Sequence, residues 1–129
     1  TCGDLFEQQT LLTAALAGLE RLRAATVGQS AVLIAGLPLL KGTRLFNVAA
    51  VLQDGRLLAF VGKTYLPNYR EFYEKRQFCS IREHDGSPVE INGELVPLGQ
   101  DILLEAGGVK LGIELSVAAI VDRRRIFAQ

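Results

Sequence analysis

The feature that most restricts the fold is a pair of apolar runs joined by a two-residue turn. Residues 45–52 and 56–61 flank Asp54 and Gly55. An Asp-Gly pair between apolar segments is a strong hairpin signal, so we expect an antiparallel β-hairpin here. Asn47 is the one polar residue in the first run. Buried asparagines usually find hydrogen-bond partners, which favours a satisfied core amide over a residue that faces a site.

A leucine stripe predicts one long helix before this hairpin. Over residues 5–25 the stripe consists of Leu5, Leu12, Leu16, Leu19 and Leu22. Asp4 with Glu7 three positions later resembles a capping box, and Gly28 is expected to end the helix. Residues 31–37 form a continuous apolar run, typical of a strand that is covered on both faces. Pro38 and the pair at residues 41–42 are expected to break it.

Two more hairpins are expected in the second half of the chain. Residues 79–99 are rich in turn formers and carry a small surface hairpin around Asn92 and Gly93. Residues 102–105 and 109–115 flank Gly107 and Gly108, and the second of these runs alternates between apolar and other residues. One face of that run holds Val109, Leu111, Ile113 and Leu115. Together these elements predict a mixed α/β (α+β) fold with a layered core.

Composition excludes several classes of function. At 129 residues, 49% of them hydrophobic, the chain fits one domain with a core. Its 14 basic and 14 acidic residues balance without a basic stripe, so no nucleic-acid partner is expected. No apolar run reaches the ~20 residues that a membrane-spanning helix needs. Two cysteines and one histidine predict neither a disulfide framework nor a metal site, and a cytoplasmic location is expected.

The residues that suggest chemistry lie in residues 63–78 (KTYLPNYREFYEKRQF), which hold five of the nine aromatic residues. The apolar run before them places Lys63 at the end of a strand, and Pro67 then turns the chain away. Residues that follow strands in this way often carry function. The alternative is a solvated amphipathic turn, since Glu71 and Lys75 are spaced i,i+4 and Tyr73 continues an apolar face.

This segment resembles the lysine segment of the glutaminase domains of glutamine-dependent NAD(+) synthetases, members of the nitrilase (carbon–nitrogen hydrolase) superfamily. Residues 2–6 (CGDLF) and 95–103 (LVPLGQDIL) are similar to further segments of that family. The resemblance implies a four-layer α-β-β-α sandwich of which residues 1–129 form part. It also implies L-glutamine as substrate, and ammonia that a synthetase domain of the same polypeptide uses to amidate deamido-NAD. ATP and Mg are expected only in that other domain, and no cofactor is expected in this one.

The resemblance also implies roles for individual residues. Lys63 matches the family's catalytic lysine, which stabilises the oxyanion of an amide hydrolysis. Glu71 matches the second glutamate, which orients that lysine. Tyr69 matches a tyrosine that contacts the bound glutamine, whereas Arg70 and Glu74 are given roles in structure or at the mouth of the pocket.

Two parts of the family's machinery are not matched. The resemblance places the base glutamate before Thr1, and the nucleophilic cysteine where Ser116 stands. Residues 121–129 resemble a helix that follows the nucleophile only after another strand. A parallel strand needs a crossover of a dozen or more residues, so a segment is expected to be absent between Leu115 and Val117. This chain alone is expected to hydrolyse nothing.

Other interpretations remain open. One is another amidase of the nitrilase superfamily, and another is a catalytically inactive assembly module of the same fold. Cys79 and His84 could form a dyad, but catalytic dyads are assembled from distant segments, so we interpret Cys79 as packing and His84 as a surface-loop residue. Because one helix cannot cover all the apolar strands, the native protein is predicted to be a homo-oligomer.

Overall fold

The computed structural model describes residues 3–68 and 73–115. Its helices are η1 (Gly3–Glu7), α1 (Gln9–Ala25), η2 (Glu74–Arg76) and η3 (Ile81–Glu83). Its strands are β1 (Leu33–Lys41), β2 (Arg44–Gln53), β3 (Arg56–Gly62), β4 (Val89–Ile91), β5 (Glu94–Val96), β6 (Leu98–Gly99), β7 (Leu103–Ala106) and β8 (Val109–Gly112). The protein is therefore a mixed α+β structure, as the sequence predicted at this level. None of the helices within these residues has the length and apolar character needed to cross a bilayer.

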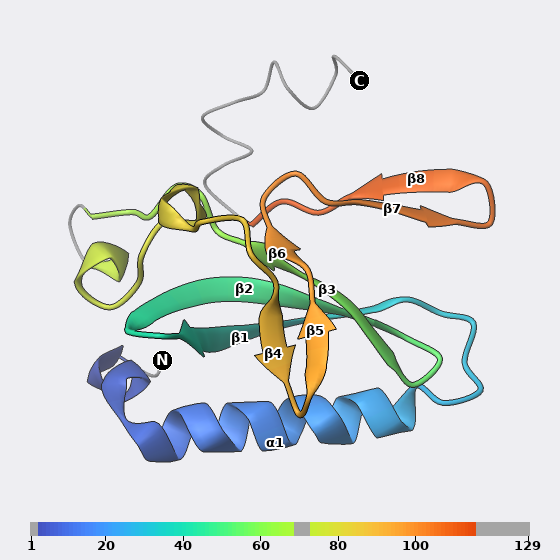
Figure 1. The fold of residues 1–129 in the computed structure, drawn as a ribbon, viewed down its shortest axis with the longest axis horizontal. Coiled ribbons are helices and arrows are strands. Elements are labelled where there is room, and N and C mark those ends of the chain that lie inside the picture. Colours follow the sequence, from blue (N-terminus) through green and yellow to red (C-terminus); the bar gives the residue numbers. More distant parts are fainter. Residues whose placement is uncertain (1–2, 69–72, 116–129) are drawn as a thin grey trace.

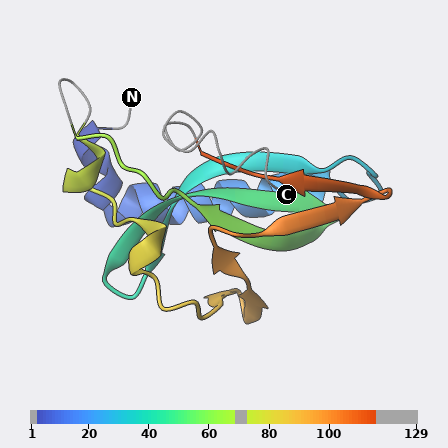
Figure 2. The ribbon, with the colours of Figure 1, turned by 90° about the horizontal axis from the view of Figure 1, so that it is seen from above.

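The main sheet has the strand order β1-β2-β3-β6, with β6 parallel to β3 and the other neighbours antiparallel. The predicted turn joins β2 to β3, and both Asp54 (φ 47°) and Gly55 (φ 70°) take the left-handed conformation that such a turn requires. Figure 1 shows α1 along one face of the sheet, and both views place the β7–β8 hairpin on the opposite side (Figures 1 and 2). The central strand β2 is buried at most positions because both of its faces are covered.

The core lies between α1, the sheet and the β4–β5 hairpin. Leu19 of α1 packs in one cluster with Val48 and Phe60 of the sheet and with Val89 and Val96 of the hairpin. The turn of that hairpin was predicted correctly, with Asn92 at φ 50° and Gly93 at φ 80°. Its placement at the surface was wrong, because Val89 and Val96 are 5% and 1% exposed and belong to the core. Burying large apolar side chains of this kind stabilises a fold by roughly 1.5–3 kcal/mol each.

The start of the chain departs from its prediction. Asp4 and Glu7 form no capping box, because both belong to the separate 3-10 helix η1. The helix α1 begins after Gln8, which makes no side-chain cap bond, and Thr26 follows its last residue. The only capping box in the residues described here is at η3, between Ser80 and Glu83.

The strand predicted at residues 31–37 is also different in position and environment. It is β1, which begins at Leu33, continues through Pro38 and ends at Lys41. It is not covered on both faces, since Ile34 and Leu40 are each 43% exposed. Pro38 is tolerated for two reasons. β1 lies at the edge of the described sheet, where a proline without an N–H breaks fewer hydrogen bonds. The residue opposite Pro38 is Asn47, and its carbonyl oxygen bonds to Lys63 on the other side of β2, so this position in the β1–β2 pair needs no N–H from Pro38.

The β7–β8 hairpin turns at Gly107 and Gly108, as predicted, but its second strand ends at Gly112. Val109 and Leu111 are on one face but exposed. The predicted break near Ser116 falls outside the described residues.

Candidate functional site

A buried lysine marks the end of β3. Its main-chain N–H donates to the carbonyl oxygen of Asn47 at 2.8 Å, which extends the β2–β3 ladder by one residue beyond Gly62. The Lys63 side chain is only 8% exposed. A charged side chain at this depth needs a charged or hydrogen-bonding partner, because removing an ammonium from water is costly.

Glu74 is that partner. Its Oε2 lies 2.6 Å from Lys63 Nζ, and its Oε1 accepts a hydrogen bond from Asn47 Nδ2 at 2.9 Å. The Glu74 side chain is 22% exposed, so it closes the solvent side of the ion pair. The chain brings Glu74 here because its N–H donates to the carbonyl oxygen of Pro67 at 3.1 Å, which draws the start of η2 back toward the end of β3.

These contacts change the sequence-based picture of the site. Lys63 lies at a strand end, as predicted. Asn47 has a hydrogen-bond partner, as expected of a satisfied amide, and that partner is Glu74. Tyr69 and Glu71 fall outside the described residues. Glu74 was missed as the partner of Lys63, and the signal that could have found it is the lone asparagine in an apolar strand.

The residues that follow η2 support the end of β3 from one side. The N–H of Ile81 donates to the Lys63 carbonyl oxygen at 3.0 Å, and Ser80 Oγ donates to the Thr64 carbonyl oxygen at 2.6 Å. Gly62 lies directly against the Ile81 side chain, where a Cβ would come within 2.5 Å of it. The main chain around Lys63 is therefore held in position by hydrogen bonds and by close packing.

A mixed polar group borders the same strand end. Thr64 Oγ1 donates to Gln100 Oε1 at 3.1 Å. Arg82 Nη2 donates to the Tyr65 hydroxyl at 2.9 Å, and the same guanidinium lies 4.8 Å from the centre of the Tyr65 ring. These polar side chains flank the segment that follows Lys63, and the hydrogen bonds named here pair them with one another.

Cys79 and His84 do not show the contacts of a dyad in the described structure. Cys79 packs against the core cluster, as predicted. The interpretation of His84 as a surface-loop residue was wrong, because its side chain is only 5% exposed. Its ring packs edge-on against Phe46, with centroids 5.8 Å apart, and Nε2 lies 2.8 Å from the Ser87 carbonyl oxygen. The histidine therefore anchors the loop between η3 and β4.

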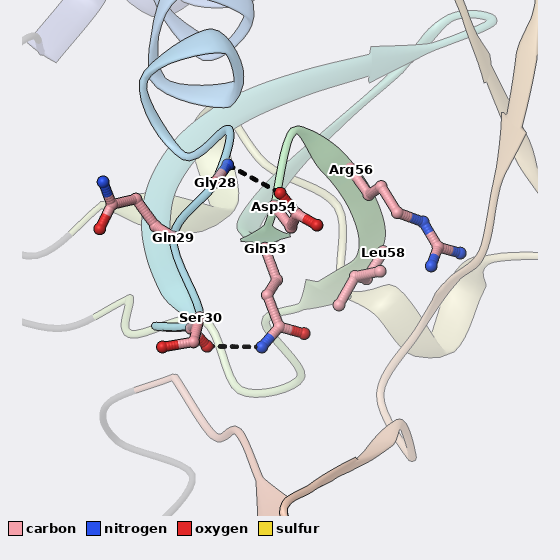
Figure 3. Close-up of a pocket in the computed structure, with 7 residues that line it drawn as sticks. All are labelled: Gly28, Gln29, Ser30, Gln53, Asp54, Arg56 and Leu58. Atoms are coloured by element: carbon pink, nitrogen blue, oxygen red, sulfur yellow. Dashed lines mark hydrogen bonds between the residues drawn. The ribbon is translucent and has the colours of Figure 1, made fainter.

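A hollow of about 370 Å³ lies at the opposite end of β3 from Lys63. It is lined by Gly28, Gln29, Ser30, Gln53, Asp54, Arg56 and Leu58. Figure 3 shows two hydrogen bonds within the lining. The Gly28 N–H donates to Asp54 Oδ1 at 2.8 Å, and Gln53 Nε2 donates to the Ser30 carbonyl oxygen at 2.7 Å. We interpret it as a structural junction between two turns. Residues 3–68 and 73–115 contain no cluster of side chains suited to a metal ion.

Comparison with known proteins shows which enzymes the chain is similar to. No protein-family model matches the chain. A glutamine-dependent NAD(+) synthetase of Mycobacterium tuberculosis (strain H37Rv) is 36% identical over 115 residues, which are 87% of this chain and 17% of the relative. One from Xanthomonas campestris is 37% identical over 90 residues, or 70% of this chain and 16% of the relative. The chain is homologous to part of the glutamine-dependent NAD(+) synthetases.

Two solved structures share the fold of this chain. The crystal structure of a glutamine-dependent NAD(+) synthetase from Cytophaga hutchinsonii has a TM-score of 0.77 at 22% identity, over 86% of this chain and 19% of that one. The enzyme from Acinetobacter baumannii, solved in complex with ADP, has a TM-score of 0.64 at 23% identity, over 97% of this chain and 21% of that one. The chain thus spans about a sixth of the length of the curated relatives it matches.

Proposed function

We propose that this chain is part of the glutaminase domain of a glutamine-dependent NAD(+) synthetase. In this proposal the domain releases ammonia from glutamine, and a synthetase domain of the same polypeptide uses it for the ATP-dependent amidation of deamido-NAD. The observation that carries the proposal is the buried ion pair between Lys63 and Glu74, at 2.6 Å, in a chain whose relatives bear that name.

Lys63 would act as the cation that stabilises the oxyanion. An ammonium has three N–H groups, and the contact to Glu74 Oε2 uses one of them. Another can donate to the carbonyl oxygen of a bound carboxamide, where negative charge develops only as the tetrahedral intermediate forms. Glu74 balances the charge of buried Lys63 before the reaction. The lysine is therefore already in place when negative charge develops on the carboxamide oxygen.

Glu74 contacts Lys63 at 2.6 Å, so we propose that it helps to orient the lysine, the role that the resemblance implies for Glu71. Tyr69 stays our candidate for contact with glutamine, and Glu71 stays our candidate for the second glutamate beside the lysine. Amide hydrolysis also needs a cysteine thiolate that attacks the carboxamide carbon, and a carboxylate that carries the proton to departing ammonia. Water then releases glutamate from the thioester. In this proposal both groups come from segments other than those described here.

The proposal extends to the architecture and the assembly. Residues 1–129 would form part of a four-layer α-β-β-α sandwich of the nitrilase type, in a cytoplasmic homo-oligomer. The burial of β2 on both faces supports a layered arrangement. ATP and Mg would belong to the synthetase domain, and we assign no residue of this chain to them.

Turnover by the protein expressed from its full gene tests the proposal. Glutamate should form from glutamine, and NAD should form when deamido-NAD and ATP are also present. Glutamate formation without NAD would favour another amidase of the nitrilase superfamily. Failure to hydrolyse glutamine, with or without deamido-NAD, would favour an inactive assembly module.

A further inference from the structure

Asn47 contacts both members of the ion pair through different groups. Its side-chain N–H donates to Glu74 Oε1 at 2.9 Å, and its main-chain carbonyl oxygen accepts from the Lys63 N–H at 2.8 Å. The neighbouring residues Phe46 and Val48 are 1% and 0% exposed, so Asn47 sits on the most firmly packed strand of the sheet. It links the rigid core to a carboxylate on the short helix η2.

We propose that Asn47 is the positioning residue of the site, which fixes the Glu74 carboxylate so that Oε2 alone faces Lys63. A glutamate side chain ends in a torsion with a broad energy profile, so one contact to an ammonium does not determine the carboxylate's rotation. A second hydrogen bond, from Asn47 to Oε1, fixes that rotation. The Asn47 amide is neutral. It therefore donates to Oε1 without replacing Lys63 as the cation beside Glu74 and without repelling the carboxylate.

The role of the amide depends on its donor. If its oxygen faced Glu74, two acceptors would oppose each other, so the nitrogen belongs there. An aspartate at this position would place a second carboxylate beside the pair and attract the lysine. A leucine of similar size would leave Oε1 without this donor. The two substitutions should therefore change the environment of Lys63 in opposite directions.

Trace acetylation measures that environment directly. The protein expressed from its full gene is treated with limiting acetic anhydride, and mass spectrometry gives the acetylation rate of Lys63 relative to Lys110, an exposed lysine on the β7–β8 hairpin. In Asn47→Leu the ratio should rise about tenfold or more, as expected for the loss of one hydrogen bond to a carboxylate. In Asn47→Asp it should fall below that of the unaltered protein.

Gln53→Leu is the matched control. Gln53 is another amide on β2, and its Nε2 donates one hydrogen bond, to the Ser30 carbonyl oxygen at 2.7 Å. Its removal should leave the Lys63 ratio unchanged. An unchanged ratio in Asn47→Leu, or an equal rise in Gln53→Leu, would overturn the proposal. If Asn47→Asp does not fold, the Leu variant still decides.

The consequence for catalysis rests on the proposed function and has its own measurement. Asn47→Leu should lower kcat for glutamine hydrolysis by about ten- to a hundredfold with little change in KM, because a misplaced catalytic group costs rate more than binding. Retained hydrolysis in a variant whose acetylation ratio has risen would count against the catalytic role of Lys63. The acetylation ratio itself would still support positioning by Asn47.

Discussion

At the scale of single residues, Lys63 is a cation on a strand that is otherwise almost entirely apolar. Burying one ion of a pair costs several kcal/mol, and only good geometry and further hydrogen bonds offset that cost. Lys63 has both, through Glu74 and through the bond from Asn47 to Glu74. An arrangement like this adds little to stability compared with an apolar core, so its presence agrees better with a functional role than with a structural one.

The carboxylate partner can be tested by substitution. Glu74→Gln removes the negative charge beside buried Lys63 and should lower the free energy of unfolding by about 3 kcal/mol, the lower end of the range for a broken buried pair. Urea unfolding measures this. Glu90→Gln, at an exposed position on β4, is the control and should change stability by less than about 0.5 kcal/mol. A loss in Glu71→Gln larger than in Glu74→Gln would favour Glu71 as the main charge partner of Lys63.

Gly62 gives a second prediction at this scale. An alanine Cβ there would lie 2.5 Å from Ile81 Cδ1 and Cγ1, so Ile81 would have to move, and with it the hydrogen bond to the Lys63 carbonyl. Gly62→Ala should destabilise the protein by about 1–3 kcal/mol, as overpacking does. Gly36→Ala, on β1 with open space around the new methyl group, should cost little. Equal thermal unfolding of the two variants would contradict the close approach of η3 to β3.

At the scale of elements, the loop between η3 and β4 is fastened to the β1–β2 hairpin. Lys41 Nζ lies 3.2 Å from Asp85 Oδ1 and donates to Ser87, and Arg44 donates to the Glu83 carbonyl oxygen. The side-chain and backbone hydrogen bonds from Ser87, followed by the one from Lys41, hold the pKa of the Asp85 carboxyl well below its usual range.

This pKa shift predicts how stability depends on pH. A carboxyl with a lowered folded-state pKa contributes stability above its unfolded pKa, and that contribution is lost as the pH falls toward the folded value. The difference in urea midpoint between the unaltered protein and Asp85→Asn should be constant from about pH 5 to 7 and shrink below about pH 4. Ser87→Ala should weaken this pH dependence. A difference that grows on acidification would contradict the fastening role of Asp85.

Elements with local signals were predicted well. The turns at residues 54–55 and 92–93 are encoded by residue pairs that tolerate positive φ, and both hairpins formed there. The strand through Pro38 was misjudged, because an edge position depends on which strands lie beside it and not on the local sequence. The start of α1 was misjudged because η1 takes up the capping-type residues before it.

The site was predicted only as far as one strand end. The position of Lys63 follows from the apolar run before it. The spacing of Glu71 and Glu74 gives no information on which carboxylate reaches Lys63, because residues 63–68, which lead away from β3, form no helix or strand. Only the fold brings Glu74 and Asn47 together, from residues 27 positions apart.

At the scale of the whole molecule, apolar surface remains uncovered within the described residues. Leu33, Ile34 and Leu40 of β1 are 36–43% exposed, and Val109 of the β7–β8 hairpin is 65% exposed. We predict that the protein expressed from its full gene is a homo-oligomer, since such surfaces are usually buried in an interface. Light scattering coupled to gel filtration measures the mass. A monodisperse monomer at micromolar concentration would contradict this prediction.

The nitrogen source for NAD synthesis in a Lys63→Ala variant shows whether Lys63 acts in glutamine hydrolysis. NAD formation should be compared with glutamine and with ammonia as donors, in the protein expressed from its full gene. Lys75→Ala, at an exposed lysine of η2, is the matched control and should leave both rates unchanged. Lys63→Arg should not restore the glutamine rate, because a planar guanidinium does not replace a compact ammonium.

Lys63→Ala should lower the glutamine-driven rate about a hundredfold or more, while the ammonia-driven rate persists. The persisting rate also shows that the protein is folded. A glutamine-driven rate within about tenfold of the unaltered protein would contradict the oxyanion role of Lys63 and, with it, the proposed glutaminase site.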